Sequence, residues 1–430
     1  MSLAARILSP QRDVSSQDPA FLQARVSAYY DRVAENESHL LRGRLPERNA
    51  LLLVSNDYLD LGSHPDVIGA KVRVLQEEGH GLLRSDVFRH GPGPLTDFER
   101  DLARLLQSED TVLCQSGWAA NVGLMQSIAD AGTPVYLDMQ VHTSMWEGIK
   151  SAGANGRPFR HNDPASLEKM HGRYGPGIVV VETVYSTSGG VCPLGDIVDV
   201  AEQFGSVLVV DESHSLGVFG PQGAGIAVAE GLASRIHFRT ASLSKAFAAR
   251  GGMVAGSARN IEFFRYESFP AIFSTGVLPH EAAGFQATLK LIRGGHRLRE
   301  RLHANADYLR YHLPALDYNI GESQSQIVSI IAGSEARTLV LRDALESHGI
   351  FGSVFCWPAT AKNRALIRFS VNSSITQAEL VRLVAVCERI RNEIGREEKP
   401  APKIPVRPAE VLQPTSSWPG FPALFGLTRR

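Results

Sequence analysis

Asp211 and Lys245 each follow an apolar stretch of the chain, and their residue types could act together. Asp211 comes directly after Val207–Val210, and Lys245 follows a less regular stretch, His237 to Ala241. Taken singly, Asp211 is more simply a helix cap and Lys245 a solvated lysine. Together they suit a pyridoxal ring, because its Schiff-base lysine needs an acid nearby to keep the ring nitrogen protonated.

The residues around Lys245 and two further segments add to this hypothesis. Ser242, Ser244 and Ala246 are small, as close approach to a ring requires. Gln115–Trp118 lies between a predicted strand and a predicted helix, where free backbone N–H groups suit a phosphate, although an ordinary turn would have the same pattern. His142 could stack on an aromatic cofactor, but a lone histidine is more often structural.

The elements that would position these residues alternate between strand and helix. Short apolar runs separated by helical patterns predict a mostly parallel sheet that is buried on both faces. Ligands of such sheets gather at the carboxyl ends of the strands, which is where the polar residues lie. The predicted strands are 111–114, 135–137, 178–181, 207–210 and 237–241.

The predicted fold class is therefore α/β, with a large sheet domain and a smaller C-terminal α+β domain. A helix is expected from Phe21, a strand at 51–54, and a helix at 96–107 that a capping box of Thr96 and Glu99 would begin. The later pattern predicts helices at 282–312, 335–347 and 376–395 and strands at 327–331, 350–356 and 365–371. The predicted divisions are an arm and helix (1–60), a large domain (61–290), a small domain (291–397) and a Pro-rich tail (398–430).

The composition of the chain excludes several classes of protein. The 430 residues are 43% hydrophobic and 21% charged with a net charge of -1, which is ordinary for a globular enzyme and gives no support for a nucleic-acid partner. No apolar run approaches the ~20 residues of a membrane span. The first residues lack the apolar core of a secretory signal, so a cytoplasmic location is expected. Four scattered cysteines argue against a zinc site or disulfides.

Other catalytic signatures are missing from the sequence. Asp211–His214 spells a helicase-like box, but no P-loop accompanies it. The sequence contains neither HExxH nor GxSxG. The pyridoxal hypothesis therefore has no competitor among these motifs.

Several motifs in order resemble the α-oxoamine synthases, a family of pyridoxal 5'-phosphate (PLP) enzymes of fold type I. The most specific are Asp211–Gly217 (DESHSLG) and Thr240–Ala246 (TASLSKA), preceded by Ser55–Leu59 (SNDYL). The likeness covers most of residues 50–390. It implies a homodimeric acyltransferase that condenses an amino acid with an acyl-CoA and releases carbon dioxide.

The resemblance assigns roles to individual residues. Lys245 would be the Schiff-base lysine and general base, and Asp211 the partner of the ring nitrogen. His142 would stack on the ring and could polarise the thioester carbonyl, while His214 and Ser186 would lie near the phenolic oxygen. The phosphate would be held by Ser116, Gly117, Trp118 and Ser242, joined by Ser274 and Thr275 of the partner subunit, and the substrate by Asn56, Glu182 and Arg368.

Departures from the family pattern bear on the substrate. Residues 82–89 (LLRSDVFR) are bulky or charged where many members are rich in Gly and Ser, which argues against a small amino acid. Segments 116–123, 144–148 and 351–360 resemble the quorum-sensing autoinducer synthases of the family. The resemblance then implies S-adenosylmethionine, or another amino acid with a γ-substituent, and a medium- or long-chain acyl-CoA.

Three alternatives remain at this level. A housekeeping member, such as an 8-amino-7-oxononanoate synthase or a 2-amino-3-ketobutyrate CoA ligase, is disfavoured by residues 82–89. A non-catalytic partner subunit would lack the lysine that is present as Lys245. An aminotransferase would share the cofactor, but the spacing of Asp211 and His214 favours condensation.

Overall fold

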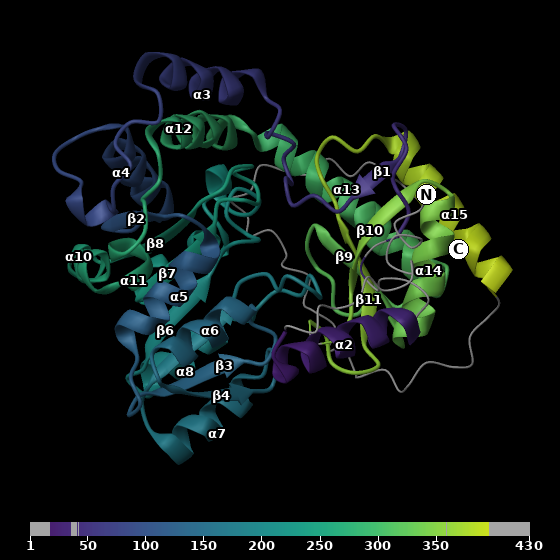
Figure 1. Cartoon of the computed structure of the whole chain (residues 1–430), viewed down its shortest axis with the longest axis horizontal. Coiled ribbons are helices and arrows are strands. Elements are labelled where there is room, and N and C mark those ends of the chain that lie inside the picture. Colours follow the sequence, from purple (N-terminus) through teal and green to yellow (C-terminus); the bar gives the residue numbers. More distant parts are fainter. Residues whose placement is uncertain (1–17, 36–40, 42, 358, 395–430) are drawn as a thin grey trace, which may run out of the picture.

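The structure is a computed structural model that describes residues 18–35, 41, 43–357 and 359–394 (Figure 1). Its strands form a seven-stranded sheet and a four-stranded sheet. The predicted α/β class is confirmed. We propose that the two sheets are the centres of the predicted large and small domains, whose boundaries remain a prediction. The Pro-rich tail lies outside the described residues.

The larger sheet has the strand order β2-β8-β7-β6-β5-β3-β4. Only β8 runs antiparallel to its neighbours, so the predicted mostly parallel sheet is confirmed. Two of its strands have no clear sequence pattern and were not predicted: β4 is an edge strand that contains Pro158, and β8 begins and ends with glycine. The strands are β2 (Asp110–Cys114), β3 (Pro134–Asp138), β4 (Asn155–Phe159), β5 (Ile178–Glu182), β6 (Val207–Asp211), β7 (Phe238–Ser242) and β8 (Gly252–Gly256).

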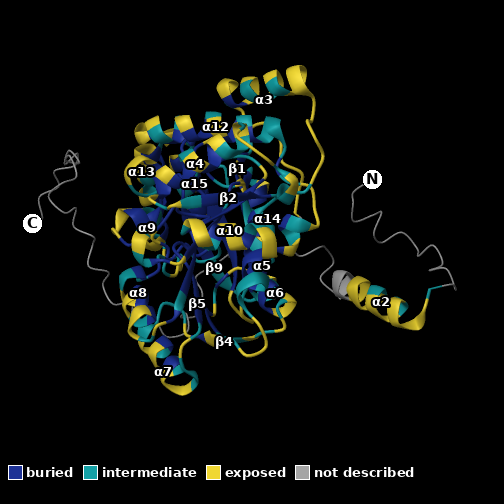
Figure 2. Ribbon diagram, turned by 90° about the vertical axis from the view of Figure 1, so that its left-hand side faces the viewer, coloured by how far each residue is buried: buried dark blue, intermediate teal, exposed yellow. Residues whose placement is uncertain are grey.

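Helices cover this sheet and bury most residues of its inner strands. Every residue of β5 and β8 is buried, and Figure 2 shows the strands in dark blue beneath helices with exposed outer faces. α5 packs on β7 and β8, and α3 lies along α12. The helices are α3 (Pro65–Glu78), α4 (Pro94–Leu106), α5 (Gly117–Ile128), α6 (Thr143–Ser151), α7 (Pro164–Tyr174), α8 (Leu194–Gln203), α9 (Ile226–Ala229), α10 (Ala258–Glu267), α11 (Phe269–Ile272) and α12 (Pro279–Gly294), with 3₁₀ turns at Asp86–Phe88, Pro221–Gly223 and Ala233–Arg235.

The smaller sheet has the order β1-β10-β11-β9, and β1 joins it in parallel with β10. The helix predicted at 335–347 is confirmed, whereas the one predicted at 282–312 is two helices that separate at Gly294 and Gly295, a pair with low helix propensity. The elements are α2 (Ala20–Glu35), β1 (Leu51–Leu53), α13 (His296–Ala315), β9 (Ile327–Gly333), α14 (Glu335–Ser347), β10 (Ile350–Phe355), β11 (Ala365–Ser370) and α15 (Gln377–Ile394).

The capping box predicted at Thr96 and Glu99 is wrong. α4 begins earlier, at Pro94, and Thr96 is its third residue, whose hydroxyl bonds with the backbone N–H of Gly93 at 2.8 Å. The Glu99 side chain is instead 2% exposed and accepts a hydrogen bond from the backbone N–H of Leu113. The Glu99 side chain therefore makes a contact with a distant strand, although the local spacing predicted that it would cap the helix.

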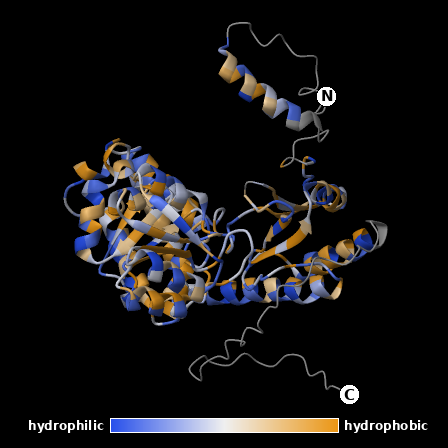
Figure 3. Cartoon of the chain, turned by 90° about the horizontal axis from the view of Figure 1, so that it is seen from below, coloured by the Kyte–Doolittle hydropathy of each residue, from blue (hydrophilic) through white to orange (hydrophobic). Residues whose placement is uncertain are grey.

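Hydrophilic and hydrophobic residues alternate along the helices (Figure 3). Among the described residues, none of the helices combines the length and apolarity that crossing a membrane would need. The same part of the chain contains no group of three or more His, Cys, Asp or Glu side chains arranged to bind a metal ion.

Candidate active site

The carboxyl ends of the central strands bring four polar side chains to one edge of the larger sheet. Glu182 and Asp211 end β5 and β6 and are paired in register. Ser242 ends β7, the next strand, and Asp138 ends β3 on the other side. The predicted clustering of polar residues at this edge is therefore found in the structure.

Asp211 is held as an oriented carboxylate. It is 4% exposed, and its two oxygens accept hydrogen bonds from the backbone N–H of Ser213 and from the side-chain amide of Asn121, both at 2.8 Å. Such bonds orient a buried carboxylate and replace part of the hydration that it loses on burial. A fixed negative charge here is what a protonated ring nitrogen requires.

Lys245 follows β7 and is partly buried. Burial lowers the pKa of its amine, and the positive charge of Arg368 lowers it further, against the opposing effect of Asp211 and Glu182. Within the described residues, no hydrogen bond or ion pair to this amine is found. Its basic, neutral form is thus accessible at a lower pH than in a free lysine.

Four small residues make a close-packed cradle at the N-terminus of α5. A Cβ at Gly117 would lie 2.5 Å from the Cβ of Ser242, and a Cβ at Gly252 would lie 2.2 Å from the carbonyl oxygen of Ser116. The Ser116 hydroxyl caps the helix by accepting from Ala119 N at 3.0 Å. A twelve-residue helix that begins in such a cradle offers backbone N–H groups and a positive dipole end to a phosphate.

His142 caps α6 and stands beside the same cradle. Its ring lies edge-on to Trp118, with ring centroids 6.0 Å apart. Its backbone N–H donates to a Glu182 oxygen at 2.5 Å, and the other Glu182 oxygen accepts from the N–H of Ser186 at 3.3 Å. Glu182 thereby connects the backbone at His142 with the backbone at Ser186. Burial raises the pKa of the Glu182 carboxyl group well above its usual value.

His214 bonds with a residue that the sequence analysis did not single out. The hydroxyl of Tyr58 lies 2.6 Å from Nδ1 of His214, and both side chains are buried. Burial lowers the pKa of His214 well below its usual value, and the charges of Lys245 and Arg368 act in the same direction. The neutral form of the histidine is therefore favoured. Tyr58 lies within the motif Ser55–Leu59, which was the available signal.

Arg368 extends from the smaller sheet to this edge. Its Nη1 donates to the carbonyl oxygen of Ser186 at 2.8 Å and its Nη2 to Oδ1 of Asn56 at 3.1 Å. Its Nε is buried and has no hydrogen-bond partner among the described residues, which leaves an unsatisfied donor. A buried guanidinium that lacks a carboxylate partner fits the carboxylate of an amino-acid ligand.

A cavity of about 300 Å³ opens between this arginine's neighbours and the loop after β7. Ser244, the neighbour of Lys245 in the chain, and Asn56 both line this cavity. A second, smaller cavity has Gln115 and Thr275 in its wall. The lining residues of the first are Ser55, Asn56, Asp57, Ser244, Ala248, Ala249 and Arg250.

Ser274 and Thr275 lie on the surface, near Gln115 at the start of the cradle. Both are exposed, and the Ser274 hydroxyl donates to the carbonyl oxygen of Pro270 at 2.6 Å. The carbonyl of Thr275 accepts from the side-chain amide of Gln115 at 2.9 Å. A role of these hydroxyls at a partner's phosphate stays a prediction.

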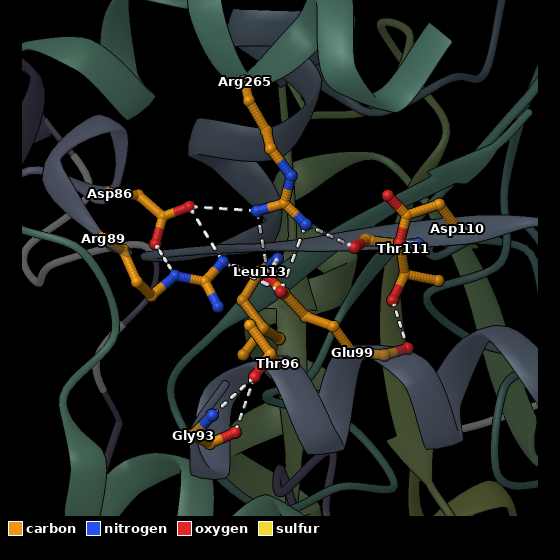
Figure 4. A network of polar contacts seen from close by, with 9 residues as sticks. All are labelled: Asp86, Arg89, Gly93, Thr96, Glu99, Asp110, Thr111, Leu113 and Arg265. Carbon is orange, nitrogen blue, oxygen red and sulfur yellow. Dashed lines mark hydrogen bonds and ion pairs between the residues drawn. The ribbon is translucent and has the colours of Figure 1, made fainter. Parts of the chain in front are cut away.

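The unusual segment 82–89 is paired with this surface segment and firmly anchored. Ser85 forms a β-bridge with Thr275, and Gly276 N donates to the carbonyl of Arg84 at 3.0 Å. Figure 4 shows how the segment is anchored: the Glu99 carboxylate lies between the guanidinium groups of Arg89 and Arg265. Asp86 bridges the same two arginines, at 2.7 and 3.2 Å.

These features fit PLP. The cradle suits its phosphate, Asp211 its ring nitrogen, and Lys245 its aldehyde, while the unsatisfied Arg368 donor suits a substrate carboxylate. The chain matches the aminotransferase class I and II family over residues 48–386 and belongs to it. It is a PLP-dependent enzyme.

Comparison with known proteins refines the class to the α-oxoamine synthases, as the motifs predicted. The chain is 40% identical to the CAI-1 autoinducer synthase of Vibrio campbellii over 87% of this chain and 96% of the relative. It is 29% identical to the 8-amino-7-oxononanoate synthase of Treponema denticola over 88% and 98%. A solved serine palmitoyltransferase from S. paucimobilis with a bound PLP–myriocin aldimine has a TM-score of 0.79 and 26% identity, covering 89% of this chain and 99% of that one.

Proposed function

We propose that this enzyme condenses an amino acid with an acyl-CoA and releases carbon dioxide, giving an α-aminoketone precursor of a quorum-sensing signal. The observation that carries the proposal is the 40% identity with a CAI-1 autoinducer synthase along 96% of that relative. The identity with the 8-amino-7-oxononanoate synthase is lower, at 29%.

The chain's own side chains account for the steps of this reaction. Arg368 would bind the carboxylate of the amino acid through its free Nε. Lys245, whose amine pKa is lowered by burial, would remove the α-proton as a general base. His142 would donate a hydrogen bond to the thioester carbonyl, where negative charge develops on attack. PLP, when bound, supplies an electron sink for the electrons left at the α-carbon.

The other predicted site residues would hold the cofactor and substrate. Asp211 would carry the charge opposite the ring nitrogen, and His214 and Ser186 would contact the phenolic side of the ring. Asn56 and Glu182 would line the substrate site. The phosphate contacts would come from Ser116, Gly117, Trp118 and Ser242, and from Ser274 and Thr275 of a second subunit.

The anchored segment 82–89 supports a substrate other than a small amino acid. Its Asp86 and Arg89 form ion pairs with one another, with Glu99 and with Arg265. These ion pairs would hinder a movement of the segment's bulky residues on substrate binding. An amino acid with a γ leaving group, such as S-adenosylmethionine, would have a reaction open to it that glycine and alanine do not have. After loss of the α-proton, removal of a β-proton would allow the γ-substituent to leave with its bonding electrons by β,γ-elimination, and glycine and alanine have no γ-substituent.

We expect S-adenosylmethionine to be preferred over 2-aminobutyrate, glycine, alanine and serine by about tenfold or more in kcat/KM, as expected when pocket contacts discriminate between substrates. The measurement offers each amino acid with one medium-chain acyl-CoA and identifies products by mass spectrometry. Longer acyl chains should gain roughly 0.8 kcal/mol per methylene until the apolar pocket is filled.

Lys245→Ala, assayed with the same panel, gives the background for non-enzymatic products. If alanine with pimeloyl-CoA, or glycine with acetyl-CoA, is the best pair by a wide margin, the enzyme is a housekeeping synthase and the signal-precursor proposal fails.

We also propose that the enzyme is a homodimer with shared active sites. Apolar side chains stand exposed on the paired segments 82–88 and 273–276, where Phe273 is 77% and Leu82 72% exposed. Exposed apolar groups of this kind mark protein–protein contacts. A two-fold pairing is the commonest oligomer symmetry.

Subunit mixing tests the shared site. Lys245→Ala and Thr275→Ala subunits should each be impaired alone, but a mixed dimer would carry both lesions in one site and none in the other. An equal mixture should therefore regain about a quarter of wild-type activity, because half of the dimers are mixed and each has one intact site. Two preparations of Lys245→Ala serve as the control. Activity no higher than that of the better single variant, once exchange is demonstrated, would refute shared sites.

A further inference from the structure

A chain of hydrogen bonds links Asp211 to the ring of His142 through two buried side chains that carry no assigned role. The amide nitrogen of Asn121 lies 2.8 Å from Oδ2 of Asp211 and 2.9 Å from the hydroxyl of Ser144. That hydroxyl lies 2.8 Å from Nδ1 of His142. Asn121 is 3% and Ser144 0% exposed. The two residues come from α5 and α6, which pack together.

The charge of Asp211 sets the direction of every bond in this chain. An ionised carboxylate only accepts hydrogen bonds, so Asn121 must turn its NH₂ group, not its oxygen, toward Asp211. The second hydrogen of that NH₂ group then points at the Ser144 oxygen. The single hydroxyl hydrogen of Ser144 is left for Nδ1 of His142.

Nδ1 of His142 consequently accepts hydrogen bonds from two donors, the hydroxyl and the backbone N–H of Ser144. The backbone N–H of Ser144 also approaches Nδ1, at 3.3 Å, as the cap of α6. A neutral imidazole has one N–H group, so a ring that accepts at Nδ1 carries its proton on Nε2. Burial lowers the pKa of His142, and the charge of Lys245 does so too although Asp211 opposes them, which favours the neutral ring.

We propose that Asn121 and Ser144 are positioning residues that fix His142 in the tautomer protonated at Nε2, so that this histidine presents a hydrogen-bond donor and not a base. The inference rests on the proposed function only for what the donor would meet, the thioester carbonyl. Nε2 has no hydrogen-bond partner within the described residues and is free to donate to a ligand. The tautomer itself follows from the protein's own contacts.

The test is the ¹⁵N NMR spectrum of the holoenzyme labelled at histidine, because protonated and unprotonated ring nitrogens have well-separated shifts. His142→Gln identifies the signals of this residue. We expect Nε2 of His142 to be protonated and Nδ1 unprotonated near neutral pH. A wild-type ring protonated at Nδ1, or doubly protonated, would overturn the proposal without the need for any variant.

Two variants and one control test the role of the chain. Ser144→Ala removes the hydroxyl donor, so a second signal from the Nδ1-protonated form should appear. Asn121→Ala frees the Ser144 hydroxyl to rotate and should cause a smaller change. Ser127→Ala, which removes a hydroxyl of α5 that donates to the carbonyl of Leu124, should leave the His142 signals unchanged. Ser144→Thr, which keeps the hydroxyl, should restore the single tautomer.

Turnover gives an independent readout. Ser144→Ala should lower kcat by about 10- to 100-fold, less than the ~10²–10³-fold loss on removing a transition-state donor outright, with little change in the KM of the amino acid. An unchanged tautomer in both Ser144→Ala and Asn121→Ala would refute the positioning role. A failure of the proposed function is distinguishable, because the spectrum would stand while no acyl-CoA product formed.

Discussion

Replacing Lys245 with alanine is expected to lower turnover by at least about 10⁴-fold, the upper range for removal of a general base, while the protein still folds. The loss should be that large because the same amine would hold the cofactor covalently and move the α-proton. The fold should persist because the amine has no hydrogen-bond or ion-pair partner among the described residues, and such side chains contribute little to stability.

Three measurements check this expectation. The wild-type protein should be yellow as purified, and borohydride should attach the cofactor to the peptide that contains Lys245. The variant should show neither property, although it can still bind PLP non-covalently. Lys150→Ala is the matched control, since that lysine has a 69% exposed side chain paired with Glu147. Normal turnover by Lys245→Ala would contradict the mechanism.

Residues that end buried strands could be predicted from the sequence alone. Val207–Val210 is a continuous apolar run, so its burial and the position of Asp211 at the sheet edge follow from local pattern. Lys245 was found because small residues surround it and a strand precedes it. The helix at 335–347 was predicted with its correct bounds, since its apolar spacing is regular.

Contacts between distant segments could not be predicted in this way. The bond between Asn121 and Asp211 depends on how α5 packs on β7 and β8, and the two residues are 90 positions apart. Arg368 bonds with Asn56 across 312 positions of the chain. The sequence around each of these side chains contains no pattern that predicts which distant residue it will contact.

Tertiary contacts also overrode a local signal. The spacing of Thr96 and Glu99 is that of a capping box, yet Arg89 and Arg265 draw the Glu99 carboxylate into a buried ion-pair cluster (Figure 4). A buried carboxylate between two guanidinium groups is held more strongly than one at an exposed helix end. Local spacing could not reveal that outcome, because Arg265 lies far along the chain.

Asp211→Asn is expected to slow exchange of the substrate α-proton with deuterated water by about 10²–10³-fold, the usual cost of losing one electrostatic contact to a transition state. The substitution keeps the size of the side chain and removes its negative charge. The ring nitrogen would then no longer be held protonated, and the ring would accept electrons from the α-carbon less readily. Proton NMR of the α-hydrogen follows this step without any acyl-CoA.

The structure shows why the variant should fold and why its defect should extend beyond the ring nitrogen. One side-chain oxygen can still accept from Ser213 N, but an NH₂ group opposite Asn121 would face another donor. Asn121 can answer by turning its amide, because its Oδ1 is buried without a partner at present. That turn would point an acceptor at Ser144 and release the hydroxyl from His142, so Asp211→Asn should also mix the His142 tautomers.

The control is Asp196→Asn, which changes an exposed acid on α8 and should alter neither property. Unchanged α-proton exchange in Asp211→Asn at saturating cofactor would refute the assignment of Asp211, whatever the histidine does.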